Sequence, residues 1–475
     1  MNIRFETTGC RLNQIETESA ANEFVNSGFN VILSPLTAKS PVDDDCLLCV
    51  INTCAVTQKA EQKDRRIIRL VLEKCPSAVV IVTGCYAQLS AELLNSMDLR
   101  IAVLKGQLKS RIVEVPDLLK KELENGVYKP ADFAQKLRTG LFSAPVKLQF
   151  TSENAFRLAT DSFLAHSRSS IKIQDGCNCK CSYCAINIAR GRSVSLAAEE
   201  VIKRVQALEK AGQAEVVFTS VNIGQYVSSW EGKAINFTGL LKLCLDATKN
   251  IAFRISSLYP EVVNEEFCSV IKDPRVRPHF HISVQSGSNH VLGAMKRNYL
   301  AEDVINAARM LKQAKANPFL AADIITGFPG ESDEDFEQTM SLCRACDFAW
   351  VHVFPFSARP GTAAYDMKPK IPQSVSGERA KKLSAWAFEN KIKYINSFKG
   401  KTVSAVLETV KKPSVFQGGA GKSVFHAVTE NFLHCEIISS EKAFKPGSAI
   451  QLKILGPIGL GAKKGGEVDT LAEFD

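Results

Sequence analysis

Four cysteines lie close together near the middle of the chain. Cys177, Cys181 and Cys184 have the spacing C-x3-C-x2-C, and Cys179 lies between the first two. Three thiolates on one tight loop can hold three corners of a 4Fe-4S cube and leave the fourth iron open. Zinc is the main alternative, but a closed structural zinc site needs four ligands, and no downstream Cys or His pair completes one at ordinary spacing. The spacing therefore favours an iron–sulfur cluster, with Cys179 as a possible ligand in another register.

Three further cysteines each follow a short apolar run in the first part of the chain. They are Cys10 in Thr-Gly-Cys-Arg-Leu-Asn-Gln, Cys54 in Asn-Thr-Cys-Ala-Val-Thr and Cys85 in Thr-Gly-Cys. Separated cysteines of this kind are more often buried core residues than ligands when spacing alone is considered. Their role therefore depends on whether the fold brings them together.

The amino-terminal part has the alternation of an α/β domain. Strands are predicted at 3–7, 46–52 and 79–83, and helices at 14–27, 55–73 and 87–95. A parallel sheet is expected, with all three cysteines at the edge where its strands end. We assign residues 1–104 to this domain and 105–166, where the pattern weakens and prolines recur, to a mildly basic connecting segment with a little local structure.

Six strand and helix units follow in series. Strands are predicted near 171–174, 215–219, 252–256, 280–284, 319–325 and 350–354, with helices between them. This rhythm fits a partial (βα)6 barrel over residues 167–399, whose active site should lie at the carboxyl ends of the strands. A long helix at 375–398 leads to short alternating runs, which predict a small β-barrel at 400–465.

The composition is that of a globular protein with a basic excess. The 475 residues are 45% hydrophobic and include 15 cysteines, and no apolar run approaches the ~20 residues that span a bilayer. An odd cysteine count without a secretory pattern argues against a disulfide scaffold, so we expect a cytoplasmic protein with no membrane partner. The formal charge of +9 suits an acidic partner such as nucleic acid.

The cysteine motifs resemble those of the radical S-adenosylmethionine superfamily and, more narrowly, its methylthiotransferases. Tyr183, just before the last loop cysteine, agrees with the superfamily pattern. Longer similar blocks start at His279 (His-Phe-His-Ile-Ser-Val-Gln-Ser-Gly-Ser), Asp323 (Asp-Ile-Ile-Thr-Gly-Phe-Pro-Gly-Glu) and His352 (His-Val-Phe-Pro-Phe-Ser-Ala-Arg-Pro-Gly-Thr). The resemblance covers nearly the whole chain.

The resemblance implies two 4Fe-4S clusters and S-adenosylmethionine as cofactors. One cluster would sit on the C-x3-C-x2-C loop and cleave S-adenosylmethionine to a radical, and the other, on Cys10, Cys54 and Cys85, would hold the sulfur that is inserted. No general acid or base stands out. The candidates for contacts with S-adenosylmethionine are Tyr183, Asn222, Ser256, Ser257, Gln285, Gly327 and Phe328.

The chain departs from the family pattern at three places. Cys179 and Lys180 lie where relatives have other residues, residues 186–188 replace a segment that commonly contains proline, and Tyr259 replaces a Glu. None of these changes removes a cluster ligand. They affect the shape expected for the S-adenosylmethionine pocket.

Family targets are adenosine 37 of tRNA, carrying an isopentenyl or a threonylcarbamoyl group, or an aspartate of a ribosomal protein. The motifs at 52–57 and 189–192 resemble the threonylcarbamoyladenosine branch most. The expected function is therefore addition of a methylthio group to C2 of N6-threonylcarbamoyladenosine in tRNA, with flavodoxin or ferredoxin as reductant. The other two substrates, and a non-catalytic iron–sulfur or zinc RNA-binding protein, are the alternatives.

The carboxy-terminal barrel resembles a TRAM domain, which binds RNA. Lysines in such a module can contact phosphates and position an RNA without reading its sequence. The candidates for this role are Lys401, Lys411, Lys412 and Lys422.

Overall fold

The structure is a computed structural model that describes residues 1–126, 128–143, 152–159, 168–408, 423–439, 446–458 and 469–475. The chain divides into two compact units. The first unit comprises Met1–Leu164, Lys172–Leu196 and Ser357–Tyr365, and the second comprises Ala165–Ile171, Ala197–Phe356 and Asp366–Asp475. These units divide the chain differently from the predicted domains, because the C-x3-C-x2-C loop belongs with the amino-terminal sheet.

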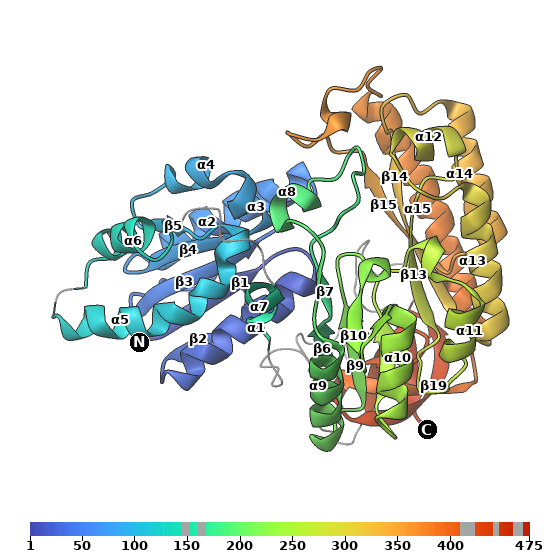
Figure 1. Ribbon diagram of the computed structural model, residues 1–475, viewed down its shortest axis with the longest axis horizontal. Helices are drawn as coiled ribbons and strands as arrows, with labels where there is room; N and C mark the ends of the chain where they lie inside the picture. The colour runs from blue at the N-terminus through green and yellow to red at the C-terminus, as the bar shows by residue number, and fades with distance from the viewer. Residues whose placement is uncertain (127, 144–151, 160–167, 409–422, 440–445, 459–468) are drawn as a thin grey trace. The chain divides into compact units, whose positions relative to one another are not determined.

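The first unit is built on a parallel sheet of five strands in the order β2-β1-β3-β4-β5 (Figure 1). The strands are β1 (Asn2–Thr7), β2 (Asn30–Ile32), β3 (Cys46–Thr53), β4 (Val79–Gly84) and β5 (Ile101–Val103). The helices are α1 (Arg11–Asn26), α2 (Gln58–Lys74), α3 (Cys85–Leu89), α4 (Ala91–Asn95), η1 (Gly106–Glu114), α5 (Val115–Glu124), α6 (Pro130–Thr139), α7 (Ser152–Phe156) and α8 (Ile186–Arg190). The predicted parallel α/β sheet is confirmed.

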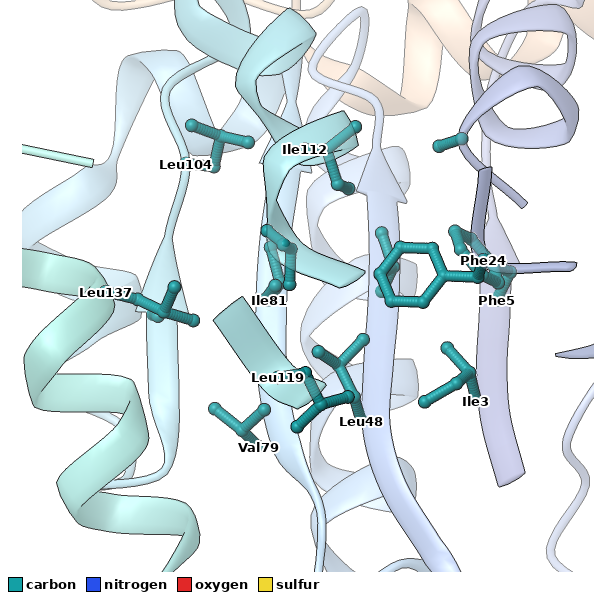
Figure 2. Packing of buried hydrophobic residues seen from close by; sticks show 14 of the residues in the cluster. Ile3, Phe5, Phe24, Leu48, Val79, Ile81, Leu104, Ile112, Leu119 and Leu137 are labelled. Atoms are coloured by element: carbon teal, nitrogen blue, oxygen red, sulfur yellow. The ribbon is translucent and has the colours of Figure 1, made fainter. Parts of the chain in front are cut away.

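Both faces of this sheet are buried. On β3, Leu48 and Val50 face one core, and Cys49 and Ile51 face the other. This explains the near-continuous apolar strand sequences, which are typical of parallel sheets covered on both sides. Figure 2 shows the first core, where side chains of β1, β3 and β4 meet those of α1, η1, α5 and α6.

Two details differ from the sequence expectation. The helix predicted at 87–95 is two short helices, α3 and α4, that meet at Ser90. The region read as a connector contains η1, α5 and α6, whose Leu119 and Leu137 are fully buried in the first core. Two of the prolines in this segment, Pro116 and Pro130, lie in the first turn of a helix, where the missing N–H costs nothing.

The second unit contains the barrel strands. Two parallel three-stranded sheets have the orders β12-β9-β6 and β13-β14-β15, and the parallel bridge between Leu258 and Ile282 joins them. The strands are β6 (Ser169–Lys172), β9 (Glu215–Thr219), β12 (Ala252–Ile255), β13 (His279–Gln285), β14 (Phe319–Thr326) and β15 (Trp350–Pro355). The main helices are α9 (Ala198–Lys210), α10 (Phe237–Asp246), α11 (Glu265–Ile271), α12 (Asn289–Ala294), α13 (Ala301–Ala314), α14 (Asp333–Cys346) and α15 (Gln373–Asn396). The six predicted strands are therefore present, in a partial parallel barrel.

The same unit ends in a closed five-stranded barrel, as predicted. Its strands are β16 (Thr402–Glu408), β17 (Ser423–Thr429), β18 (His434–Ser439), β19 (Ala449–Pro457) and β20 (Thr470–Phe474). β20 lies beyond the predicted end of the domain, yet it pairs with both β18 and β19 and closes the barrel.

No helix in the described part of the chain is long and apolar enough to cross a membrane.

Candidate cluster sites and strand ends

The fold brings Cys10, Cys54 and Cys85 to one edge of the amino-terminal sheet. Cys10 is the N-cap residue of α1, Cys54 directly follows β3, and Cys85 is the first residue of α3 after β4. Strands β1, β3 and β4 are adjacent and parallel, so their carboxyl ends share this edge. The prediction that these strands end at one edge of the sheet is confirmed.

Two glycines leave room for the cysteine loops to approach each other. A methyl group on Gly9 would lie 2.8 Å from Cys54 Sγ, and one on Gly84 would lie 2.4 Å from the carbonyl oxygen of Thr53. Gly84 also has a positive φ of 94°. The glycine of each Thr-Gly-Cys motif is therefore required by close packing next to a cysteine.

Asparagine and aspartate side chains hold the three loops together. Asn13 Nδ2 donates to the carbonyls of Thr8 (3.0 Å) and Thr53 (3.1 Å). Asp64 accepts from Thr8 Oγ1 (2.6 Å) and from the backbone N–H of Cys54 (2.9 Å). Asn13 and Asp64 therefore join the loops that carry Cys10 and Cys54.

The thiols are suited to metal ligation. Burial raises the pKa of Cys54 to about 12 and also raises that of Cys85, so both are protonated thiols at neutral pH without a metal. Cys10, in contrast, is exposed at the sheet edge. A cluster binds thiolates and releases their protons, and three cysteine thiols at one sheet edge are the donor set that it needs. The residues present fit the predicted cluster.

We predict that Gly84→Ala removes the amino-terminal cluster. The added methyl group meets the Thr53 backbone at 2.4 Å and must displace the loop that carries Cys85. Gly28→Ala is the matched control, because Gly28 also has a positive φ (86°) but nothing within 4 Å of the new methyl group. Left-handed strain costs both variants about 1–2 kcal/mol. Iron analysis after reconstitution should show loss of about half of the iron in Gly84→Ala alone; equal iron in both variants would contradict the assignment.

The second cysteine loop leaves the short strand β7 (Gln174–Asp175), which pairs with β8 (Val194–Ser195). Gly176 has a positive φ of 70°, and a methyl group there would lie 2.0 Å from the carbonyl oxygen of Arg192. The Cys177 N–H donates to Gly191 O (3.1 Å), and Asn187 Nδ2 donates to Cys177 O (2.7 Å). The loop is thus fixed at its base before the first cysteine.

The three cysteines of this loop differ in exposure. Cys177 is buried, whereas Cys181 and Cys184 are partly exposed, as is Cys179. The backbone N–H of Cys179 donates to Cys177 Sγ (3.4 Å). An N–H bond to sulfur stabilises a thiolate, so residue 179 supports Cys177 through its main chain whatever its side chain does. Tyr183 lies within the same loop and is partly buried. Ligation of a cluster by this loop stays a prediction.

The segment Ser357–Tyr365 ties this loop to α2 within the first unit. Ala364 N–H donates to Ser182 O (2.7 Å), and Gln58 N–H donates to Ser357 Oγ (3.1 Å). Arg359, 3% exposed, forms an ion pair with Glu61. The sequence block that begins at His352 therefore contains a strand and a following segment that connects the cysteine loop to α2.

A buried cluster of charged side chains lies behind both cysteine sites, and sequence reasoning missed it. Lys172 Nζ lies 2.9 Å from Glu16 and 3.0 Å from Asp175, and Arg190 Nη1 lies 3.2 Å and 3.0 Å from the same two carboxylates. Lys109 also pairs with Glu16. Arg190 Nη2 donates to Asn13 Oδ1 (2.7 Å). One network therefore joins α1, η1, β6, β7 and α8.

This network carries one more positive than negative charge next to the amino-terminal cysteines. The guanidinium of Arg190 opposes the burial that raises the pKa of Cys85, and so favours its thiolate. The cations hold the pKa of Glu16 and Asp175 well below the ordinary range, although burial alone would raise it. The Ala-Arg-Gly-Arg motif at 189–192 hinted at Arg190, but nothing in the sequence marked Glu16 or Lys109.

In the second unit, polar groups gather at the carboxyl ends of β9 and β12. The hydroxyls of Thr219, Ser220 and Ser256 are buried and find no hydrogen-bond partner among the described residues. Phe218 of β9 pairs with Ile255 of β12, so these hydroxyls share one strand edge. A buried hydroxyl needs a hydrogen-bond partner, which a water molecule or a polar ligand would supply here. Ser256 was predicted from the sequence, whereas Thr219 and Ser220 were not.

The other candidates at the strand ends have partners of their own. Asn222 Oδ1 accepts from Gly224 N–H (3.1 Å), and Ser257 Oγ lies 3.3 Å from His281 Nδ1. Gln285 ends β13 with a positive φ of 71°, a strained conformation that is common at ligand sites. Their contacts with S-adenosylmethionine stay predictions.

Gly327 and Phe328 have clear structural roles. A methyl group on Gly327 would lie 2.4 Å from Ser376 Cβ of α15, so the close approach here is to the protein itself. Phe328 is fully buried and packs edge-on against Phe356, with ring centroids 5.3 Å apart. Any contact of these two residues with a cofactor would have to run through the main chain.

Of the predicted RNA-binding lysines, Lys401 is exposed, and its ammonium lies 5.3 Å from the centroid of the Phe398 ring. The other three, Lys411, Lys412 and Lys422, fall outside the described residues.

Comparison with known sequences identifies two family regions in the chain. Residues 171–343 match the Radical SAM superfamily, and residues 2–106 match a family described as uncharacterized protein family UPF0004. Among solved structures, the radical S-adenosylmethionine methyltransferase TsrM from Kitasatospora setae is similar in fold, with a TM-score of 0.50 and 14% identity over 77% of each chain.

Curated relatives cover almost the whole chain. The threonylcarbamoyladenosine tRNA methylthiotransferase MtaB of Treponema pallidum is 41% identical over 95% of this chain and 98% of its own length. The enzyme of the same name from Thermotoga maritima is 33% identical over 88% of each chain. This chain belongs to the family of radical SAM threonylcarbamoyladenosine tRNA methylthiotransferases.

Proposed function

We propose that the protein adds a methylthio group to C2 of N6-threonylcarbamoyladenosine at position 37 of tRNA. The observation that carries the proposal is the pair of cysteine triads in one compact unit, in a chain 41% identical to an enzyme named for this substrate. The C2–H bond of adenine is unactivated, so an acid or base has no means of removing that hydrogen. A radical can remove the hydrogen atom from this bond without an acid or a base.

Each triad has a separate task in this proposal. Cys177, Cys181 and Cys184 would hold the 4Fe-4S cluster that, when reduced, supplies the electron for cleavage of S-adenosylmethionine, and Cys10, Cys54 and Cys85 would hold a second cluster that carries sulfur. Cys177 is kept in place by Asn187 and by the main chain of residues 179 and 191. The loops of the amino-terminal triad are held together by hydrogen bonds of Asn13 and Asp64.

The second unit would bind the cofactor and the RNA. Hydroxyls without partners at the ends of β9 and β12, with Ser256 among them, support binding of a polar ligand such as S-adenosylmethionine there. The closed β-barrel with exposed Lys401 supports RNA binding by phosphate contacts. We place the reaction in the cytoplasm, with a flavodoxin or ferredoxin as the electron donor.

We predict a specific change in tRNA when the gene is deleted. Mass spectrometry of nucleosides from the deletion strain should show loss of 2-methylthio-threonylcarbamoyladenosine and accumulation of threonylcarbamoyladenosine. Return of the wild-type gene should restore the product. An unchanged product would exclude the proposed substrate.

Nucleoside analysis of the same strain, together with mass spectrometry of its ribosomal proteins, separates the alternatives. Loss of the methylthio form of isopentenyladenosine instead would identify the other tRNA substrate, and loss of methylthio-aspartate from a ribosomal protein would identify the third. A non-catalytic RNA-binding protein would alter none of these and would not cleave S-adenosylmethionine in vitro.

A further inference from the structure

Three cysteines that play no part in either triad meet inside the first unit. The Sγ atoms of Cys46, Cys49 and Cys75 all lie within 4.8 Å of one another, and Cys46 Sγ is 3.5 Å from Cys49 Sγ. All three residues are fully buried. Among the described residues this is the one group of three or more metal-ligating side chains whose donor atoms come so close together.

A local irregularity of the sheet creates this cluster. Residues three apart on a regular strand point to opposite faces, so Cys46 and Cys49 should be separated by the sheet. The register between β1 and β3 shifts, however, because Asn2 pairs with Cys46 while Ile3 pairs with Leu48. The extra residue turns Cys46 to the face of Cys49, a change that the sequence spacing does not reveal.

Cys75 reaches the same place from the helix that covers this face. It caps the carboxyl end of α2, and its N–H donates to Val71 O (2.8 Å). All three cysteines belong to the core between α2 and the sheet. Cys54 lies just past the end of β3, and at about 3.3 Å per residue it is roughly 26 Å along the strand from Cys46 and roughly 16 Å from Cys49. The cluster is therefore separate from the predicted iron–sulfur triad.

The sulfur spacing suits a single ion. A tetrahedral zinc ion with Zn–S bonds of about 2.3 Å places its sulfur ligands about 3.8 Å apart. Cys46 Sγ and Cys49 Sγ are 3.5 Å apart and no pair exceeds 4.8 Å, so all three separations lie within about 1 Å of this value or below it, and small rotations of the side chains would let the thiolates close on an ion. A cubane is much wider and would not fit between them.

The surrounding charge also favours thiolates. Arg4 of β1 pairs in register with Cys49 and is 8% exposed, and its Nε finds no hydrogen-bond partner among the described residues. Three thiolates and one Zn²⁺ carry a net charge of minus one, which the guanidinium would balance.

The nearby carboxylate of Glu6, two residues after Arg4 on β1, already has partners. It accepts from the Leu36 N–H (2.8 Å) and lies 3.9 Å from Arg4 Nη1, and it is not among the ligand atoms that lie within 4.8 Å of the three sulfurs. The three thiolates are therefore the protein ligands of the ion, and Glu6 would supply a fourth only after a rotation of its side chain.

We propose that Cys46, Cys49 and Cys75 bind one Zn²⁺ ion, which ties the carboxyl end of α2 to the start of β3. Binding releases the thiol protons and forms three zinc–sulfur bonds, with no change of oxidation state. The site would be structural, because it is buried and lies far from the predicted cluster edge. It does not depend on the proposed tRNA substrate.

Metal analysis of the anaerobically purified, full-length protein tests this site. We expect about one zinc per chain in addition to iron. Cys75→Ser should lose the zinc and keep the iron, whereas Cys343→Ser, a change at another fully buried cysteine, should keep both. Wild-type protein without zinc, or equal zinc in the two variants, would overturn the proposal.

A second measurement excludes zinc that has entered the iron sites. In a variant with all six triad cysteines replaced by alanine, one zinc per chain should remain, and Cys75→Ser in that background should remove it. If that variant does not fold, thermal unfolding of wild type and Cys75→Ser after removal of zinc with a chelator decides the point: the chelator should lower the Tm of the wild type only. A Cys46–Cys49 disulfide found by peptide mass spectrometry of the same anaerobic sample would refute zinc binding.

Discussion

Replacement of Cys177, Cys181 and Cys184 by alanine is expected to abolish S-adenosylmethionine cleavage and to remove about half of the iron from the reconstituted protein. Two 4Fe-4S clusters hold about eight irons per chain, and this triad would hold four of them. The three alanines remove every side-chain ligand of one cluster and leave Cys10, Cys54 and Cys85 unchanged. Anaerobic reconstitution, iron analysis and chromatography of 5′-deoxyadenosine measure both effects.

Cys179→Ala is the matched control for this prediction. Cys179 lies on the same loop and is similarly exposed, but its observed contribution is the backbone N–H bond to Cys177 Sγ, which alanine keeps. The control should therefore retain about eight irons and cleave S-adenosylmethionine. If Cys179→Ala lost the iron while Cys181→Ala kept it, the cluster would use the other register. Retention of all iron in the triple variant would refute the radical cluster itself.

The sequence was enough to predict the parts of the fold that have strong local patterns. Both faces of β3 are buried, so its run of apolar residues marks a parallel strand without any knowledge of its neighbours. Cys54 and Cys85 directly follow such strands, so their meeting at one edge follows from parallel pairing alone. Local pattern and topology agree at these positions.

The remaining features depend on distant contacts. The core role of Leu119 is not evident from the sequence, because a proline such as Pro116 can end an element or lie in the first turn of a helix. The meeting of Cys46 with Cys49 depends on a register shift in the pairing of β1 with β3. Spacing along the chain carries no information on either, because both are set by how a neighbouring element packs.

The buried charge network depends on distant contacts in the same way. Glu16, 1% exposed, contacts Lys172, Arg190 and Lys109, which come from three other elements. No local pattern marks a glutamate in a helix as buried. Loss of its charge would leave three buried cations with Asp175 as their remaining carboxylate in the network.

We therefore predict that Glu16→Gln lowers the free energy of unfolding by about 3–5 kcal/mol, because an unbalanced buried charge costs that much. Glu114→Gln is the control: Glu114 pairs with Arg157 at 3.4 Å, but both side chains are 46% exposed, so its loss should cost less than about 1 kcal/mol. Urea unfolding of the full-length protein measures the difference, and hydrogen exchange of the α1 amides assigns it to the first unit. Equal stability of the two variants would mean that the network is not stabilising.

Glu16→Gln should also weaken iron retention at both triads. The network joins α1, which begins after Cys10, to β7, which precedes Cys177. A purely local loss of stability near Glu114 would not have this effect.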